Sequence, residues 1–288
     1  FNVLRANTSV GMIALGMTLV IITGGIDLAV GSTLAGVGTI LMTLIDTGEH
    51  GVLVRLGITG TPAFAIGIVL ALISGMVIGG LIGLLVTKGR VPPFIVTLGV
   101  MNVVRSVAQY FTKSYTPTVP KEFEAIANTM VLGQRPMTIL YWLVLAVIFY
   151  LVMKNTAFGR HVYAVGSNEE AANVSGVNVM KTIILVFVMA GMLYGITGFM
   201  DAARIASVNA TTGLNYESDA IAACVIGGIS FVGGIGKISG AIIGVLLLQI
   251  IFVGLNYLSV DANYLYIVKG LIILIACSID MRKYLVRK

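Results

Sequence analysis

Apolar residues occur along this chain in long runs that are separated by short polar segments. Most runs are about 17 to 25 residues long, the length at which an α-helix, rising ~1.5 Å per residue, crosses a ~30 Å hydrocarbon layer. Apolar and polar residues do not alternate within the runs, as they would in the strands of a transmembrane barrel. The pattern therefore predicts nine helices, over residues 7–24, 29–45, 63–87, 94–112, 137–153, 181–203, 219–233, 237–258 and 264–279.

The composition places these helices in a lipid bilayer. Hydrophobic residues make up 58% of the 288 residues, charged residues only 10%, and the mean hydropathy is +1.02. A water-soluble domain of this size cannot bury so much apolar surface. We therefore predict an all-α, polytopic membrane protein in which residues 1–288 form a single transmembrane domain with broken or glycine-rich helices.

The distribution of basic residues predicts the orientation of the chain. If the C-terminus is cytoplasmic, ten lysines and arginines fall on the cytoplasmic side and six on the other side, which agrees with the positive-inside rule. Nine crossings then place Phe1 outside. Because the chain opens just before an apolar run and without a methionine, we expect a tenth, N-terminal helix in the intact protein. The ten are Lys88, Arg90, Lys154, Arg160, Lys181, Lys237, Arg282, Lys283, Arg287 and Lys288, and the six are Arg5, Arg55, Lys113, Lys121, Arg135 and Arg204.

Nucleic-acid and metal chemistry are not expected. The net charge of +6 suits contact with anionic lipid headgroups, and no basic stripe with interleaved aromatic residues indicates nucleic-acid binding. Cys224 and Cys277 lie in separate apolar runs, and His50 and His161 lie in different loops. The sequence therefore predicts buried free cysteines and no metal site.

Nucleotide hydrolysis by this chain is not expected either. The sequence Gly236-Lys237 is a near match to the phosphate-binding loop GxxxxGK[ST]. The motif would need glycine at position 231 and Ser or Thr at position 238, but the chain has Phe231 and Ile238. We therefore predict a non-catalytic protein without a cofactor. Any ATP that it uses is hydrolysed by another subunit.

Asp27 is the most unusual polar residue, because it interrupts an otherwise apolar segment, residues 16–32 (GMTLVIITGGIDLAVGS). A carboxylate in hydrocarbon is costly unless the protein buries and pairs it. Gly25 and Gly31 flank Asp27 and allow the backbone to unwind. We favour a hinge in which the carboxylate accepts free backbone amides, over direct contact with a transported solute.

Other polar side chains interrupt or border the apolar runs. Asn102 and Arg105 are three residues apart on one helix, where they either bind solute hydroxyls or brace neighbouring helices. Glu217 and Asp219 stand at the start of a glycine-rich run, and we place both on a translocation path or hinge.

Four further charged residues have structural explanations. We expect Lys269 to extend its amine toward the membrane surface, and Asp201 and Arg204 to pair on one helix face. Asp280 is expected to be the solvated end of the last helix.

Three polar loops interrupt the pattern of short turns. Residues 113–136 contain three prolines and mixed charges, which predicts an ordered, non-spanning segment that is a candidate docking surface outside. The stretch 204–217 is polar and is a candidate lining for the mouth of a route. In the inner loop, 154–180, residues 167–172 (SNEEAA) predict a helix start with Ser or Asn as N-cap, and Gly176 predicts its end.

Residues 16–32, 159–179 and 216–236 together resemble the permease subunit of ABC importers for simple sugars, the family of ribose and galactoside permeases. The resemblance implies ten spans with both ends inside, in the bacterial inner membrane. It also implies three partners: a cytoplasmic ATP-binding subunit, a periplasmic or lipoprotein sugar-binding protein, and a second copy of this chain around a central path.

The same resemblance assigns a role to the inner loop, 154–180. In the family, Glu-Ala-Ala followed a few residues later by Gly fits a groove on the ATPase. An ordinary capped loop helix is the structural alternative. The coupling residues that the resemblance implies are Glu169, Glu170, Ala171, Ala172 and Gly176.

Two finer questions concern the substrate and its energy source. Several segments look slightly closer to galactose or methyl-galactoside permeases than to ribose permeases. The alternative function is an ion-coupled secondary sugar carrier that uses Asp27 as its proton or cation site. The two Gly-Gly-Ile sequences at residues 24–26 and 227–229 suggest a distant internal duplication.

Overall fold

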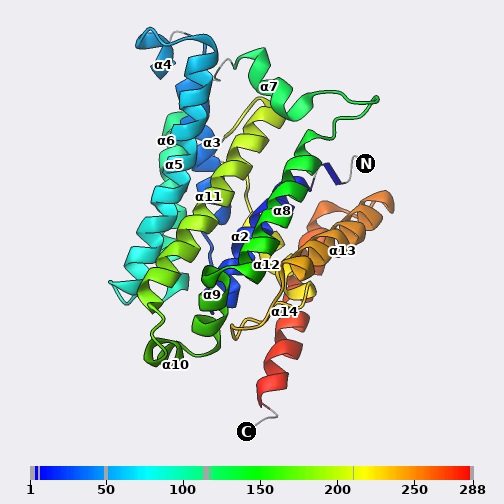
Figure 1. Cartoon of the computed structure of the whole chain (residues 1–288). Coiled ribbons are helices and arrows are strands. Elements are labelled where there is room, and N and C mark those ends of the chain that lie inside the picture. Colours follow the sequence, from blue (N-terminus) through cyan, green and yellow to red (C-terminus); the bar gives the residue numbers. More distant parts are fainter. Residues whose placement is uncertain are drawn as a thin grey trace.

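The computed structural model describes residues 4–5, 7–48, 51–112, 117, 119–209 and 211–285. These residues fold into a bundle of helices (Figure 1), which confirms the prediction of an all-α protein. The helices are α2 (Thr8–Ile22), α3 (Val30–Ile45), α4 (Val52–Arg55), α5 (Gly60–Thr87), α6 (Pro93–Thr112), α7 (Lys121–Asn128), α8 (Met137–Asn155), α9 (Ala157–Ser167), α10 (Glu169–Val174), α11 (Val179–Ile205), α12 (Tyr216–Ile226), α13 (Ile238–Tyr257) and α14 (Ala262–Leu285).

Five of the described helices, α5, α6, α8, α11 and α13, are long and apolar enough to cross a membrane. The last helix, α14, has 24 residues, whereas α2 and α3 have only 15 and 16. The short helices lie at the two ends of the bundle: α4 and α7 at one end, and α9 and α10 at the other (Figure 1). We call these the α7 end and the α10 end.

One predicted span is wrong. Residues 219–233 do not form a continuous helix, because α12 ends at Ile226 and residues 227–236 are not helical. We call residues 227–236 the glycine loop. Glycine adopts a left-handed backbone at little cost, so the residues that suggested a glycine-rich helix end it instead. Positive φ angles of 79°, 89°, 72° and 156° occur at Gly228, Gly233, Gly234 and Gly236.

The helices α2 and α12 end in the same way. The amide of Gly25 and the amide of Ile229 each bond to the carbonyl oxygen five residues earlier, at 3.0 Å. Each bond spans a left-handed glycine, Gly24 with φ 76° or Gly228 with φ 79°, as in a Schellman cap. In the two caps Gly24 corresponds to Gly228. Aligning the two Gly-Gly-Ile sequences instead matches Gly24 with Gly227, so the caps and the sequence similarity differ by one residue.

Helix α11 lies at the centre of the bundle and packs against α2, α3 and α5. It meets α5 through glycines, so that the two backbones touch. A Cβ atom on Gly79 would lie 2.1 Å from the carbonyl oxygen of Phe187, and one on Gly191 would lie 2.3 Å from that of Gly75. Lipid provides no hydrophobic drive for helices to associate, so membrane bundles depend on such close packing.

The outer surface of the bundle is apolar. Large apolar side chains are exposed along α6, α13 and α14, among them Val103, Ile250 and Leu274. By contrast, every residue of α2 is buried. A surface with this many exposed apolar side chains suits hydrocarbon better than water.

The segment 113–136 contains α7, a helix too short to span a membrane. Its Phe123 is fully buried and makes edge contacts with the rings of Phe64 and Phe199. The predicted ordered, non-spanning segment is therefore present, although residues 113–116 and 118 lie outside the described residues. Its role as a docking surface stays a prediction.

Replacing Gly79 by alanine should destabilise the bundle, because the new methyl group would collide with the backbone of α11. We expect a loss of about 1–3 kcal/mol, typical of an overpacked contact, measured by thermal unfolding in detergent micelles. Gly80→Ala is the matched control, since its Cβ would meet only a side-chain atom of Val188 at 3.5 Å. Equal stability of the two variants would contradict the glycine contact.

Candidate functional site

The helix break at Asp27 is present where the sequence predicts it. The chain leaves helical conformation after α2 and re-enters it at α3, and Asp27 between them is only 1% exposed. One oxygen of its carboxylate accepts a hydrogen bond from the amide of Ala29 at 2.8 Å. The carboxylate thus binds a backbone amide of the broken helix. Whether Asp27 acts as a hinge or on a path stays a prediction.

The glycines around Asp27 have different roles from those predicted. The left-handed residue that permits the break is Gly24, whereas Gly31 is inside the first turn of α3. A Cβ atom on Gly31 would lie 2.0 Å from the carbonyl oxygen of Gly213 and 3.1 Å from a carboxylate oxygen of Glu217. Gly31 therefore allows the polar stretch 204–217 to pack against the start of α3.

Charged side chains from three helices gather next to this contact. Glu217 and Asp219 extend from α12, and Lys269 of α14 forms an ion pair with Asp219. Arg105 of α6 is close enough to Glu217 to interact with it electrostatically. Residues that the sequence suggested separately, Gly31, Arg105, Glu217 and Asp219, are thus brought together. We call Arg105, Glu217, Asp219 and Lys269 the charged cluster.

The structure corrects the prediction for Lys269. Its side chain is only 12% exposed and pairs with Asp219 instead of extending to the membrane surface. Its amine also lies 5.4 Å from the ring centre of Phe252 and 5.3 Å from that of Tyr266. A lysine within an apolar helix needs a partner, Asp219 supplies the opposite charge nearby, and the two rings add a cation–π contribution.

Asn102 does not join the charged cluster. Its side chain is exposed on α6, and its amide donates to the carbonyl oxygen of Leu98 in the same helix at 3.0 Å. The predicted pair of Asp201 and Arg204 is confirmed, with 3.0 Å between Oδ1 and the guanidinium nitrogen. Ser9 of α2 donates to the same carboxylate oxygen at 2.5 Å.

The α10 end carries the predicted short helix. Asn168 caps it, because its side-chain oxygen accepts the amide of Ala171 at 2.9 Å. The helix ends at Val174, and Gly176 follows with φ 85°. The predicted cap and stop are confirmed, and both are local signals that a sequence carries plainly.

The predicted coupling residues lie mostly on the surface of α10. Glu169, Glu170 and Ala171 are exposed, whereas Ala172 is buried and anchors the helix. Val174 is 90% exposed, which is unusual for an apolar side chain beside a charged surface. Val174 carries no distinguishing signal in the sequence, because apolar residues are common throughout this chain.

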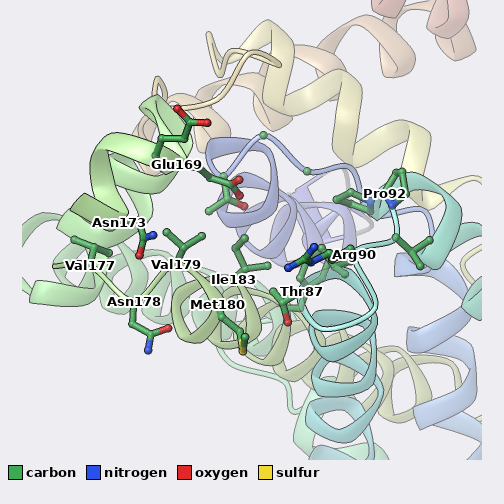
Figure 2. Close-up of a pocket in the computed structure, with 18 of the residues that line it drawn as sticks. Thr87, Arg90, Pro92, Glu169, Asn173, Val177, Asn178, Val179, Met180 and Ile183 are labelled. Carbon is green, nitrogen blue, oxygen red and sulfur yellow. The ribbon is translucent and has the colours of Figure 1, made fainter. Parts of the chain in front are cut away.

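A cavity of about 960 Å³ lies beside α10. Figure 2 shows Glu169 and Asn173 on one side of it, and Arg90 and Pro92, between α5 and α6, on the other. The end of α2 also lines it, through Thr23, Gly24 and Gly25. The predicted coupling helix and the predicted break therefore border the same space.

The prediction for Asp280 was wrong. Its carboxylate is not a free, solvated helix end, because Oδ2 accepts hydrogen bonds from the hydroxyl of Ser230 at 2.8 Å and from the amide of Phe231 at 3.1 Å. A further contact that the sequence does not predict is made by Tyr163 of α9, whose hydroxyl donates to the carbonyl oxygen of Gly236 at 2.8 Å. Both contacts join segments far apart in the chain, so no local signal reveals them.

The two cysteines lie in helices α12 and α14. Cys224 is buried and Cys277 is partly buried, and both are free thiols. Within the described residues, no three or more His, Cys, Asp or Glu side chains gather in a way that could hold a metal ion. His50 lies outside the described residues.

Five described helices of membrane-spanning length and an apolar outer surface indicate a polytopic membrane protein. The chain belongs to the family described as "Branched-chain amino acid transport system / permease component", whose pattern matches residues 1–277.

Named relatives are similar to this chain over almost its whole length. It is 38% identical to the ribose import permease protein RbsC of Escherichia coli (strain K12), and the alignment covers 98% of this chain and 85% of RbsC. It is 39% identical to RbsC of Bacillus subtilis (strain 168), over 98% of this chain and 84% of that protein. The galactose/methyl galactoside import permease protein MglC of Escherichia coli (strain K12) is 34% identical, over 100% and 87%. No solved structure matches the chain.

These identities bear on the finer substrate prediction. The higher values belong to the ribose import permeases, so overall identity does not favour the galactoside class.

The ion pair between Asp219 and Lys269 should make a measurable contribution to stability. Lys269→Met leaves a largely buried carboxylate without its partner, and we expect a loss of about 3 kcal/mol. Adding Asp219→Asn should restore much of that loss, because the unpaired charge is then gone. Thermal unfolding of both single variants and the double variant in detergent measures the coupling. Purely additive losses would contradict the pairing.

Proposed function

We propose that this chain is the transmembrane permease subunit of an ATP-driven ABC importer for a monosaccharide. The observation that carries the proposal is the capped, exposed helix α10 at one end of the bundle, in a chain 38% identical to a ribose import permease over 98% of its length. The chain would form the path, and a separate subunit would hydrolyse ATP.

The exposed surface of α10 is the proposed contact with the ATPase. Glu169, Glu170 and Val174 are accessible together at the α10 end, and Ala172 anchors the helix beneath them. Charged side chains are costly in hydrocarbon, so this surface is better suited to water or a partner protein than to lipid. Asn168 and Gly176 fix both ends of the helix and so present this surface in one conformation.

This proposal places the α10 end in the cytoplasm and the α7 end outside. Arg160, Lys181 and Lys237 then lie on the cytoplasmic side, as the positive-inside rule favours. The same orientation places the end of α14 in the cytoplasm. A sugar-binding protein would dock at the α7 end.

The proposed path runs beside the charged cluster, and a second copy of the chain completes it. Helix α14 packs against α12, and exposed side chains on α6 and α14 include Val103, Tyr110 and Tyr266. A second copy that faces this side would enclose Arg105, Glu217 and Asp219 between two apolar walls. Hydrogen-bonding groups in such a path suit a neutral, hydroxyl-rich sugar.

The ion-coupled carrier has less support. Its proposed cation site, Asp27, is 1% exposed and already bonds the amide of Ala29. The relatives RbsC and MglC are import permease proteins.

Uptake by the reconstituted importer tests the proposed function. The chain should be placed in proteoliposomes with the ATPase and binding protein encoded beside it, and supplied with radiolabelled ribose or galactose. We expect uptake that requires ATP and the binding protein and that favours one sugar. Uptake by this polypeptide alone, driven by an ion gradient, would support the carrier instead.

Glu170→Lys should weaken association with the ATPase. The substitution reverses a charge on the exposed surface of α10 and places a cation at a helix N-terminus, so we expect roughly tenfold weaker binding with an intact fold. Co-purification and the dissociation constant of the ATPase from the detergent-solubilised permease measure the change.

The matched control is Glu122→Lys, which makes the same exchange at an exposed position of α7, at the other end of the bundle. This control should leave ATPase binding unchanged. Normal assembly and transport in Glu170→Lys would remove the coupling assignment.

A further inference from the structure

The glycine loop is bonded to three helices at the α10 end. The amide of Gly234 donates to the carbonyl oxygen of Ile22, the last residue of α2, at 2.8 Å. The hydroxyl of Tyr163 in α9 donates to the carbonyl oxygen of Gly236 at 2.8 Å. Asp280 in α14 accepts from the loop at Ser230 and Phe231. The loop therefore joins α2, α9 and α14, and it continues directly from α12.

Helix α9 packs tightly against the point where the glycine loop meets the end of α2. A Cβ atom on Gly166 would lie 1.7 Å from the carbonyl oxygen of Ile22 and 2.7 Å from the amide nitrogen of Gly234. Ser167 also lies against the loop, since a Cβ atom on Gly234 would be 2.4 Å from its hydroxyl oxygen. Close-packed contacts of this kind transmit displacement, because neither partner can shift without the other.

Helix α9 is also joined rigidly to α10. Asn168 is the only residue between them, and it is both the C-cap of α9 and the N-cap of α10. The opposite side of α10 faces the cavity of about 960 Å³, which Figure 2 shows between α10 and the segment with Arg90 and Pro92. Helix α10 is therefore fixed toward α9 and has space to move toward the cavity.

We infer that Tyr163 and Asp280 are positioning residues that fasten the glycine loop to α9 and α14, so that a displacement of α10 reaches the helices of the charged cluster. The inference rests on the proposed function, because it assumes that a partner pushes or pulls α10. Helix α12 carries Glu217 and Asp219, and α14 carries Lys269. Both helices meet at the loop that Tyr163 and Asp280 hold.

The chemistry of the two residues fits this role. The Tyr163 phenol is protonated at neutral pH and so can donate a hydrogen bond, and burial raises its pKa further. Oδ2 of Asp280 accepts two hydrogen bonds from adjacent residues of the loop, which fixes the loop's orientation as well as its distance. A charged acceptor makes such bonds stronger than neutral ones.

Tyr163→Phe removes only the hydroxyl that holds Gly236. In the reconstituted importer we expect normal assembly and ATP hydrolysis, with roughly three- to tenfold less sugar transported per ATP hydrolysed. Tyr150→Phe is the matched control, because the Tyr150 hydroxyl bonds only Lys154 on α8, at 3.3 Å, among the contacts of the described residues. That control should keep the wild-type ratio.

Asp280 provides an independent pair of variants. Asp280→Ala should lower the ratio of transport to ATP hydrolysis, and Asp280→Asn, which keeps an accepting oxygen, should restore most of it. A purely structural role would lower assembly and both activities together. If neither Tyr163→Phe nor Asp280→Ala lowers the ratio further than Tyr150→Phe does, the inference is wrong.

Hydrogen exchange in the wild-type complex and in Tyr163→Phe tests the contacts of the glycine loop directly. In the wild-type complex, amide exchange in residues 228–236 should differ between the ATP-bound and nucleotide-free states, and Tyr163→Phe should reduce that difference. Loop exchange that is insensitive to nucleotide in the wild type would overturn the inference. Wild-type uptake that does not need ATP would instead refute the proposed function.

Discussion

Every backbone amide and carbonyl that leaves a helix inside a membrane needs a partner from the protein itself, and this requirement determines where the fold is polar. Residues 23–29 and the glycine loop are two of the described segments that leave helical conformation. Asp27 binds a freed amide in the first, and Asp280 binds one in the second. Both carboxylates are thus partners of the broken backbone.

Glycine also supports the broken helices, because it lets two backbones come into contact. Gly166 lets α9 touch the end of α2, and Gly31 lets the polar stretch before α12 touch the start of α3. At Gly24 and Gly228 the glycine instead permits a left-handed cap. Gly166 and Gly31 thus place a helix against another element, whereas Gly24 and Gly228 are exposed and serve the cap alone.

The sequence predicts what depends on neighbouring residues and misses what depends on distant ones. The Asn168 cap and the bond from Ala29 to Asp27 join residues two or three apart, and both were anticipated. The bonds of Lys269 and Asp280 span 50 residues, and both residues were given solvent-facing roles instead. Composition specifies apolar runs well, but nine hydrophobic runs cannot indicate which helix stops early, as α12 does at Ile226.

The charge balance of the cluster bears on the kind of solute that the proposed path admits. Arg105 and Lys269 carry two positive charges, and Glu217 and Asp219 carry two negative charges when all four are ionised. Lys269 is bound to Asp219, and Arg105 is near Glu217, so the attraction within the cluster leaves little field to draw an ion. An ion-coupled carrier needs an unbalanced site that binds its cation. A path for a neutral polyol needs polar atoms whose charges are already compensated, and the cluster fits that requirement.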